Sequence, residues 1–142
     1  MLGTTVRALT RELVERVEVP VIVSGGLNSA DAARGAYEES GADAVMIARG
    51  ALGNPWVFEE LTGRRTAPPA PEEVATELLW VMDRAEEHLG TERATRYLRK
   101  FYPWYVEPLG PDPGLADELQ RNADLPEARR LIASLATPVT SL

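Results

Sequence analysis

Two short segments of the sequence combine glycine with groups that can bind a phosphate. Ser24-Gly25-Gly26 follows the β-branched run at 21–23, and Ala48-Arg49-Gly50 ends a second apolar run that begins at Ala44. Glycine lets the backbone take positive φ and approach a ligand closely, and arginine adds a charged fork. The pattern predicts a phosphate site, although a tight turn and a solvated arginine would use the same residues.

A second segment combines positive charge with aromatic rings. Between positions 93 and 105 there are four basic residues and no acidic one, in a chain of net charge −7. The basic residues are Arg93, Arg96, Arg99 and Lys100, and the rings are Tyr97, Phe101, Tyr102, Trp104 and Tyr105. Phosphate pairing and base stacking by such residues favour nucleic-acid binding. An ordinary helix with Tyr97, Leu98 and Phe101 buried and the arginines in water would show the same pattern.

The composition excludes several other chemistries. The 142 residues contain no cysteine, so they supply no thiol acid, thiol nucleophile, disulfide or thiolate metal site. The acidic residues are not spaced as a carboxylate pair or a metal box, and we expect neither a catalytic residue nor a metal site here. The longest apolar runs have about five residues, far below the ~20 needed to span a bilayer. No secretory signal follows Met1, so we expect a cytoplasmic protein without a membrane segment.

The first half of the sequence has the pattern of a strand, a helix and a second strand. Apolar spacing predicts an amphipathic helix over 5–17, strands at 21–23 and 44–48, and a helix over 30–39 between them. Asn28 or Ser29 can cap that central helix, and Gly41 can end it. The unit predicts parallel strands covered on both faces, whose carboxyl ends bring the two glycine segments to one edge.

Beyond a proline-rich connector at 64–71 the sequence is helical. The expected helices cover residues 71–89, 91–103, 115–121 and 126–135. Thr91 is expected to cap the second of these helices, and Pro103 to break or kink it.

Taken together, these segments resemble the tRNA-dihydrouridine synthase family. The resemblance rests on Val19-Pro20-Val21-Ile22-Val23-Ser24-Gly25-Gly26 and on the run from Gly41 to Gly50. Gly53-Asn54-Pro55-Trp56, directly after the arginine-glycine strand end, is characteristic of these synthases. Arg99-Lys100-Phe101-Tyr102-Pro103-Trp104-Tyr105 is similar to the basic-aromatic segment of the family's helical domain.

The resemblance implies the fold class α/β: the C-terminal part of a (β/α)8 TIM barrel, followed by an all-α helical bundle. Residues 1–65 would form the partial FMN-binding barrel segment, as helix, strand, helix, strand and short helix, and residues 66–142 the tRNA-binding domain. The implied FMN phosphate site comprises Ser24, Gly25, Gly26, Ala48 and Arg49, and the implied RNA contacts are Arg93, Arg96, Arg99 and Lys100.

The implied activity is the reduction of uridine to 5,6-dihydrouridine in tRNA by FMN, with NADPH as reductant. The family's cysteine acid would lie in barrel strands outside these residues, so we expect this chain alone to be inactive. A non-catalytic RNA-binding or interaction module derived from such an enzyme is the alternative. Two strands alone expose hydrogen-bonding edges and an apolar face, so residues 1–65 should be marginally stable unless a partner, such as the missing N-terminal barrel half, covers them.

Overall fold

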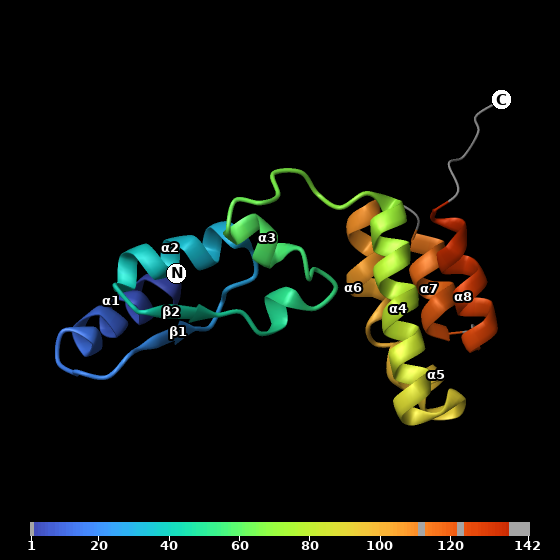
Figure 1. Cartoon of the computed structure of the whole chain (residues 1–142), viewed down its shortest axis with the longest axis horizontal. Helices are drawn as coiled ribbons and strands as arrows, with labels where there is room; N and C mark the ends of the chain where they lie inside the picture. Colours follow the sequence, from blue (N-terminus) through green and yellow to red (C-terminus); the bar gives the residue numbers. More distant parts are fainter. Residues whose placement is uncertain (1, 111–112, 122–123, 137–142) are drawn as a thin grey trace. The chain divides into compact units, whose positions relative to one another are not determined.

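The computed structural model of the chain describes residues 2–110, 113–121 and 124–136. It divides into two compact units, Met1–Ala67 and Pro68–Leu142. Figure 1 shows strands only in the first of these units, within the described residues. In the described ranges no helix is both long and apolar enough to cross a membrane.

The N-terminal unit is built around one strand, helix and strand motif. Its elements are α1 (Leu2–Val14), β1 (Ile22–Ser24), α2 (Ala30–Ser40), β2 (Ala44–Met46), the 3-10 turn η1 (Arg49–Ala51) and α3 (Val57–Leu61). The two strands pair in parallel, with Val23 opposite Val45. The parallel strand, helix and strand motif predicted from the apolar runs is therefore confirmed.

Helix α2 begins and ends at residues that its sequence predicts. The Ser29 hydroxyl accepts a hydrogen bond from the Ala32 N–H at 3.1 Å, so Ser29 is the N-cap. Gly41 takes the left-handed conformation, with φ of 68°, and its N–H bonds to the Tyr37 carbonyl. The predicted cap and the predicted glycine stop are both confirmed.

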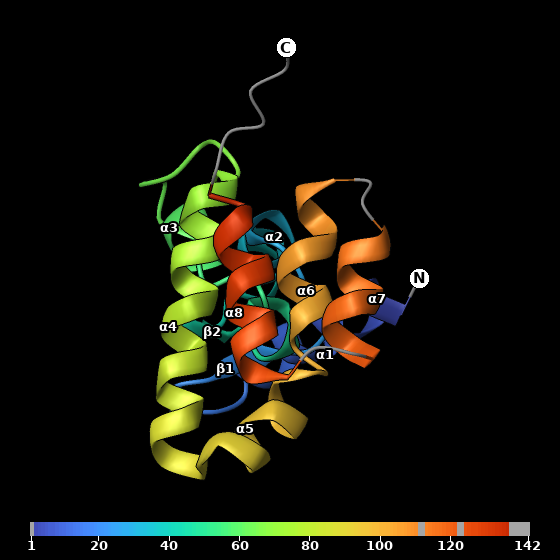
Figure 2. The ribbon, with the colours of Figure 1, turned by 90° about the vertical axis from the view of Figure 1, so that its right-hand side faces the viewer.

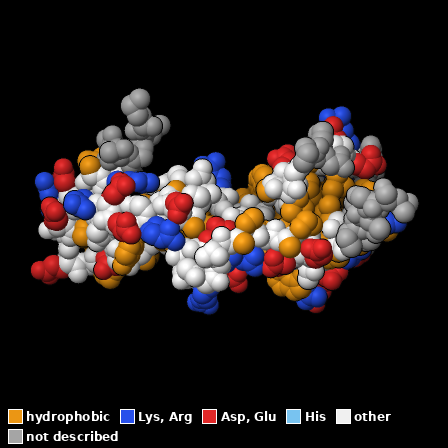
Figure 3. Space-filling view, turned by 90° about the horizontal axis from the view of Figure 1, so that it is seen from above, with side chains coloured by type: hydrophobic (Ala, Val, Ile, Leu, Met, Phe, Trp, Pro, Cys, Tyr) orange, Lys and Arg blue, Asp and Glu red, His pale blue; other side chains and the backbone are white. Residues whose placement is uncertain are grey.

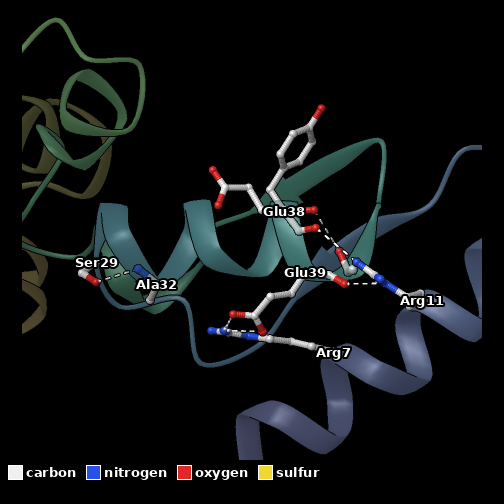
Figure 4. Close-up of polar contacts among 8 residues, drawn as sticks. Arg7, Arg11, Ser29, Ala32, Glu38 and Glu39 are labelled. Atoms are coloured by element: carbon white, nitrogen blue, oxygen red, sulfur yellow. Dashed lines mark hydrogen bonds and ion pairs between the residues drawn. The ribbon is translucent and has the colours of Figure 1, made fainter.

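Two arginines of α1 hold the last turn of α2 (Figure 4). One guanidinium nitrogen of Arg7 lies 2.8 and 2.9 Å from the two carboxylate oxygens of Glu39. Arg11 donates from Nε to the Glu39 carbonyl at 2.8 Å, and from a terminal nitrogen to the Glu38 carbonyl at 3.5 Å. Cations are favourable at the carbonyl end of a helix, so these contacts stabilise α2 as well as attach α1 to it.

The sheet of this unit is covered on one face. Val23 is buried and packs with Val45 and with the alanines of α2, which include Ala33 and Ala36. On the opposite face Ile22 is 63% exposed and Met46 54% exposed. The expectation that the strands are covered on both faces is wrong for this chain, because its described helices supply apolar cover to one face only. The predicted exposed apolar face is confirmed.

The C-terminal unit is a bundle of helices. Its elements are α4 (Pro71–Leu89), α5 (Thr91–Leu98), α6 (Tyr102–Val106), the 3-10 turn η2 (Glu107–Leu109), α7 (Pro113–Arg121) and α8 (Leu125–Ser134). Figure 2 shows α4, α8, α6 and α7 side by side, with α5 crossing one end. The fully buried side chains of the bundle include Leu78, Met82, Leu98, Tyr102 and Ile132.

Two boundaries in this unit differ from those predicted. Thr91 is the first residue of α5 and not its cap, since Gly90 is the N-cap and the Thr91 hydroxyl donates instead to Glu86 at 2.8 Å. Pro103 does not end a helix that continues from α5. It lies in the first turn of α6, where a helix needs no N–H donor, after α5 has already ended at Leu98.

A charged cluster joins α8 to α4. Arg129 donates to Asp83 at 2.6 Å and to Glu86 at 2.9 Å. The hydrogen bonds from Thr91 and Arg129 lower the pKa of the Glu86 carboxyl below its ordinary value of 4.5. Since Glu86 belongs to α4 and Thr91 begins α5, this one carboxylate links three helices of the bundle, α4, α5 and α8.

We expect Arg129→Gln to lower the Tm at about pH 7 and to have a smaller effect at about pH 3. The folded pKa of Glu86 is depressed, so its contribution is complete above the unfolded pKa and is lost as the pH falls through the folded value. Thermal unfolding followed by circular dichroism measures the difference. The control is Arg130→Gln, because Arg130 pairs with Glu127 on its own helix. An equal Tm loss in both variants at both pH values would contradict this role for the cluster.

We also expect residues 1–65 to exchange backbone amides faster than residues 72–102. The two strands have open edges and one uncovered face, whereas α4 and α5 pack on each other around buried side chains. Hydrogen exchange of the full chain, read by mass spectrometry of its peptides, makes the comparison. Uniform protection of the two segments would refute it.

Candidate functional site

The loop after β1 has a backbone that favours glycine. Gly25 and Gly26 have φ of 106° and 67°, conformations that side-chain-bearing residues rarely adopt. A Cβ at either position would meet no atom within 4 Å, and both residues are exposed. The conformation of the turn, and not a lack of space, therefore requires glycine here. Ser24 donates its hydroxyl to the Met46 carbonyl at 3.0 Å, which ties this loop to the end of β2.

The loop after β2 approaches the first loop through Gly50. A Cβ built on Gly50 would lie 2.1 Å from the Leu27 carbonyl oxygen and 2.8 Å from the Asn28 Cα. The two loops therefore pack backbone against backbone, which a residue with a side chain would prevent. The sequence marks Gly50 as the glycine of the second predicted segment, outside the five assigned site residues, but no local pattern predicts its contact with the backbone at Leu27.

Arg49 is exposed and forms no ion pair with another described residue. Ala48, also exposed, takes the unusual backbone angles φ −99° and ψ −95° just before η1. The structure thus places all five predicted phosphate-site residues at the carboxyl ends of β1 and β2. Ser24 is the last residue of β1, and the other four lie in the segments that follow the two strands, which touch through Gly50. This arrangement offers an open surface with one free guanidinium, which fits a dianionic phosphate.

The basic-aromatic segment, residues 93–105, includes most of α5, the turn after it and most of α6. Arg93 and Arg96 are exposed and lie three residues apart on α5, and the exposed Lys100 lies in the turn that follows α5. Arg96 forms an exposed ion pair with Glu92 at 3.2 Å, while Arg93 has no ion pair among the described residues.

On the face drawn in Figure 3, hydrophobic side chains gather over the C-terminal unit, and charges of both signs cover the N-terminal one.

Arg99 is separate from the other three predicted RNA-contacting cations. It is half-buried, and its Nε is inaccessible and has no hydrogen-bond partner among the described residues. Burial raises the pKa of the Tyr102 hydroxyl to about 12, and the charges of Arg129 and Arg99 oppose this rise. Tyr102 is therefore a neutral core residue near neutral pH. Leu98 is fully buried whereas Tyr97 is 44% exposed, so only part of the ordinary-helix pattern holds.

The described residues contain no group of three or more His, Asp or Glu side chains that could hold a metal ion.

Comparisons with known proteins identify the family of the chain. The sequence model of the family described as Dihydrouridine synthase (Dus) matches residues 8–138. The match includes both strand-end loops and the basic-aromatic segment. The chain therefore belongs to the dihydrouridine synthase family.

Among its relatives are proteins named tRNA-dihydrouridine synthase B. The protein from Pasteurella multocida is 33% identical over 104 residues, which cover 70% of this chain and 31% of that protein. The protein from Xanthomonas campestris is 31% identical over 134 residues, covering 89% of this chain and 40% of its own length. The chain thus spans about a third of the length of the curated relatives it matches.

We expect Gly50→Val to destabilise the N-terminal unit by about 1–3 kcal/mol, because the new side chain would force the two loops apart. The matched control is Gly35→Ala in α2, where a Cβ would meet its nearest atoms at 3.5 and 3.6 Å. That change should stabilise the unit by about 0.5–1 kcal/mol, because alanine favours the helix. Denaturant unfolding of both variants gives the two free energies. A neutral Gly50→Val would show that the loops do not depend on this contact.

Proposed function

We propose that this chain is the C-terminal portion of a tRNA-dihydrouridine synthase. Residues 1–65 would close an FMN-binding TIM barrel, and residues 66–142 would contact tRNA. The observation that carries the proposal is the family match over 8–138, which includes two contacting strand-end loops of the kind that bind phosphate in parallel barrels.

The strand-end loops fit the phosphate of FMN. Gly25 and Gly26 leave open space where side chains would otherwise stand, and Arg49 has no competing carboxylate among the described residues. We assign Ser24, Gly25, Gly26, Ala48 and Arg49 to hold that phosphate. The Ser24 hydroxyl serves mainly to position its loop, since it donates to the Met46 carbonyl. When bound, FMN supplies hydride for the uracil ring and is itself reduced again by NADPH.

The residues of this chain supply anchoring and not proton transfer. The chain contains no cysteine, so a cysteine acid must come from the barrel strands that these residues do not include. Near neutral pH the buried Tyr102 keeps its proton, with a pKa of about 12, and it lies in the helical unit. We therefore propose that the chain by itself does not reduce uridine.

The helical unit is proposed to contact the tRNA backbone through its exposed cations. Arg93 and Lys100 have no carboxylate partners among the described residues, and the ion pair of Arg96 is solvent-exposed and weak. The half-buried Arg99 is a less accessible contact than these three. The same free cations also support the second candidate, a non-catalytic RNA-binding module that uses the helical unit alone.

A chimera tests the enzymatic proposal. Residues 8–136 of this chain replace the matching segment of the Xanthomonas campestris synthase, whose match covers 89% of this chain. Dihydrouridine is then measured by mass spectrometry of tRNA treated with FMN and NADPH. We expect the chimera to form dihydrouridine, the unfused chain to form none, and Arg49→Ala in the chimera to retain less FMN. Arg64→Ala, an exposed arginine of the same unit, is the control.

A folded chimera that binds FMN but leaves tRNA unmodified would favour the non-catalytic module. Dihydrouridine formed by the unfused chain would overturn the claim that the proton donor lies elsewhere.

A further inference from the structure

Three aromatic rings form a continuous chain from α5 into α6. The centroids of Tyr97 and Phe101 lie 4.8 Å apart, and those of Phe101 and Trp104 lie 5.4 Å apart in an edge-to-face arrangement. The middle ring is half-buried, whereas Tyr97 is 44% exposed and Trp104 42% exposed. The two end rings thus keep much of their surface in water although the middle ring fixes their position.

One cation is held against this chain of rings. The Lys100 ammonium lies 4.5 Å from the centroid of Tyr97 and 5.0 Å from that of Phe101. Cation–π attraction of this kind limits the freedom of a flexible lysine without neutralising its charge. A positive group is therefore already placed beside exposed aromatic surface before any ligand binds.

The charge around the rings is unbalanced. No acidic residue occurs between positions 93 and 105, although the whole chain has a net charge of −7. Arg93 and Lys100 form no ion pair with a described carboxylate, and the pair between Arg96 and Glu92 is exposed. The surface is thus complementary to a ligand that has both negative charge and flat apolar faces.

We propose that Tyr97 and Trp104 stack on unpaired RNA bases while Arg93, Arg96 and Lys100 bind the adjacent phosphates. This inference rests on the proposed contact with tRNA and specifies its mode. A duplex presents phosphates but keeps its base faces stacked inside, and an acidic peptide presents charge without flat rings. A single-stranded loop or bulge presents both features, so it is the RNA element that this surface fits.

The test uses the full 142-residue chain and three fluorescein-labelled RNAs. They are a stem with a loop of unpaired bases, the same stem with an abasic loop, and a blunt duplex. Fluorescence anisotropy gives the dissociation constants. Stacking of one base predicts a factor of about 5 to 150, so we expect the base-containing loop to bind at least that much more tightly than the abasic loop.

Two tryptophan variants separate stacking from charge. Trp104→Ala should weaken binding of the base-containing loop by a similar factor, leave the abasic loop unaffected and leave the salt dependence unchanged. Trp80→Ala is the matched control, because Trp80 is 58% exposed in the same unit but has no ring or cation contact among the described residues. Lys100→Gln should instead lower the salt slope by about 0.7, the value for one phosphate contact of a single strand.

Folding of the variants is checked by circular dichroism. If Trp104→Ala unfolds the bundle, Trp104→Phe keeps a ring against Phe101 and should retain most of the binding. The comparison of base-containing and abasic loops on the unchanged chain needs no variant at all.

Each remaining outcome decides between named alternatives. Equal binding of all three RNAs, or equal losses in Trp104→Ala and Trp80→Ala, would overturn the stacking proposal and leave the phosphate contacts of the proposed function intact. Competition by polyglutamate as strong as that by RNA would identify an acidic peptide as the ligand. If the chain binds no RNA, or binds it with an affinity that does not change with salt concentration, the proposed tRNA contact itself is refuted.

Discussion

The architecture of the N-terminal unit depends on one constraint: its two parallel strands are too short to form a stable pair by themselves. Each strand has three residues, and a pair of this size is not stable alone in water. Helix α2 supplies the missing stabilisation, because its alanines pack on Val23 and Val45. The small side chains let the helix backbone come close to the sheet. Ser29 and Gly41 then determine where that helix begins and ends.

The pairing of these two strands also positions the two strand-end loops. The parallel register places Ser24 opposite Met46, so both strands leave the sheet at the same end, the one formed by their carboxyl termini. The Ser24 hydroxyl extends that pairing, and Gly50 lets the second loop rest on the backbone at Leu27. Backbone contacts of this kind leave Arg49 unpaired and the glycines open. The site therefore consists of backbone geometry with a single charged side chain.

Local patterns predicted the elements better than they predicted burial. Apolar runs and caps determine where α2 and the two strands lie, because those signals act within a few residues. Exposure of Ile22 and Met46 depends on what other strands are present, which no local pattern contains. Arg99 shows the same limit. Its residue type groups it with Arg93 and Lys100, but it lies at the C-cap of α5, where its Nε is inaccessible to solvent.

The boundary between α5 and α6 is marked by a proline in the sequence and by the packing of the aromatic residues around it. Pro103 lies in the first turn of a new helix, and the turn before it carries Arg99, Lys100 and Phe101 out of regular helix. In an uninterrupted helix the backbone would keep the direction of α5 through these three residues. The three rings nevertheless stay in contact, because Tyr97, Phe101 and Trp104 lie four and three residues apart, as neighbours on one helix face do. Leu98 and Tyr102, also four residues apart, are buried in the core. The aromatic chain thus follows from a helical spacing that the turn largely keeps, since Arg99 and Phe101 retain helical backbone angles.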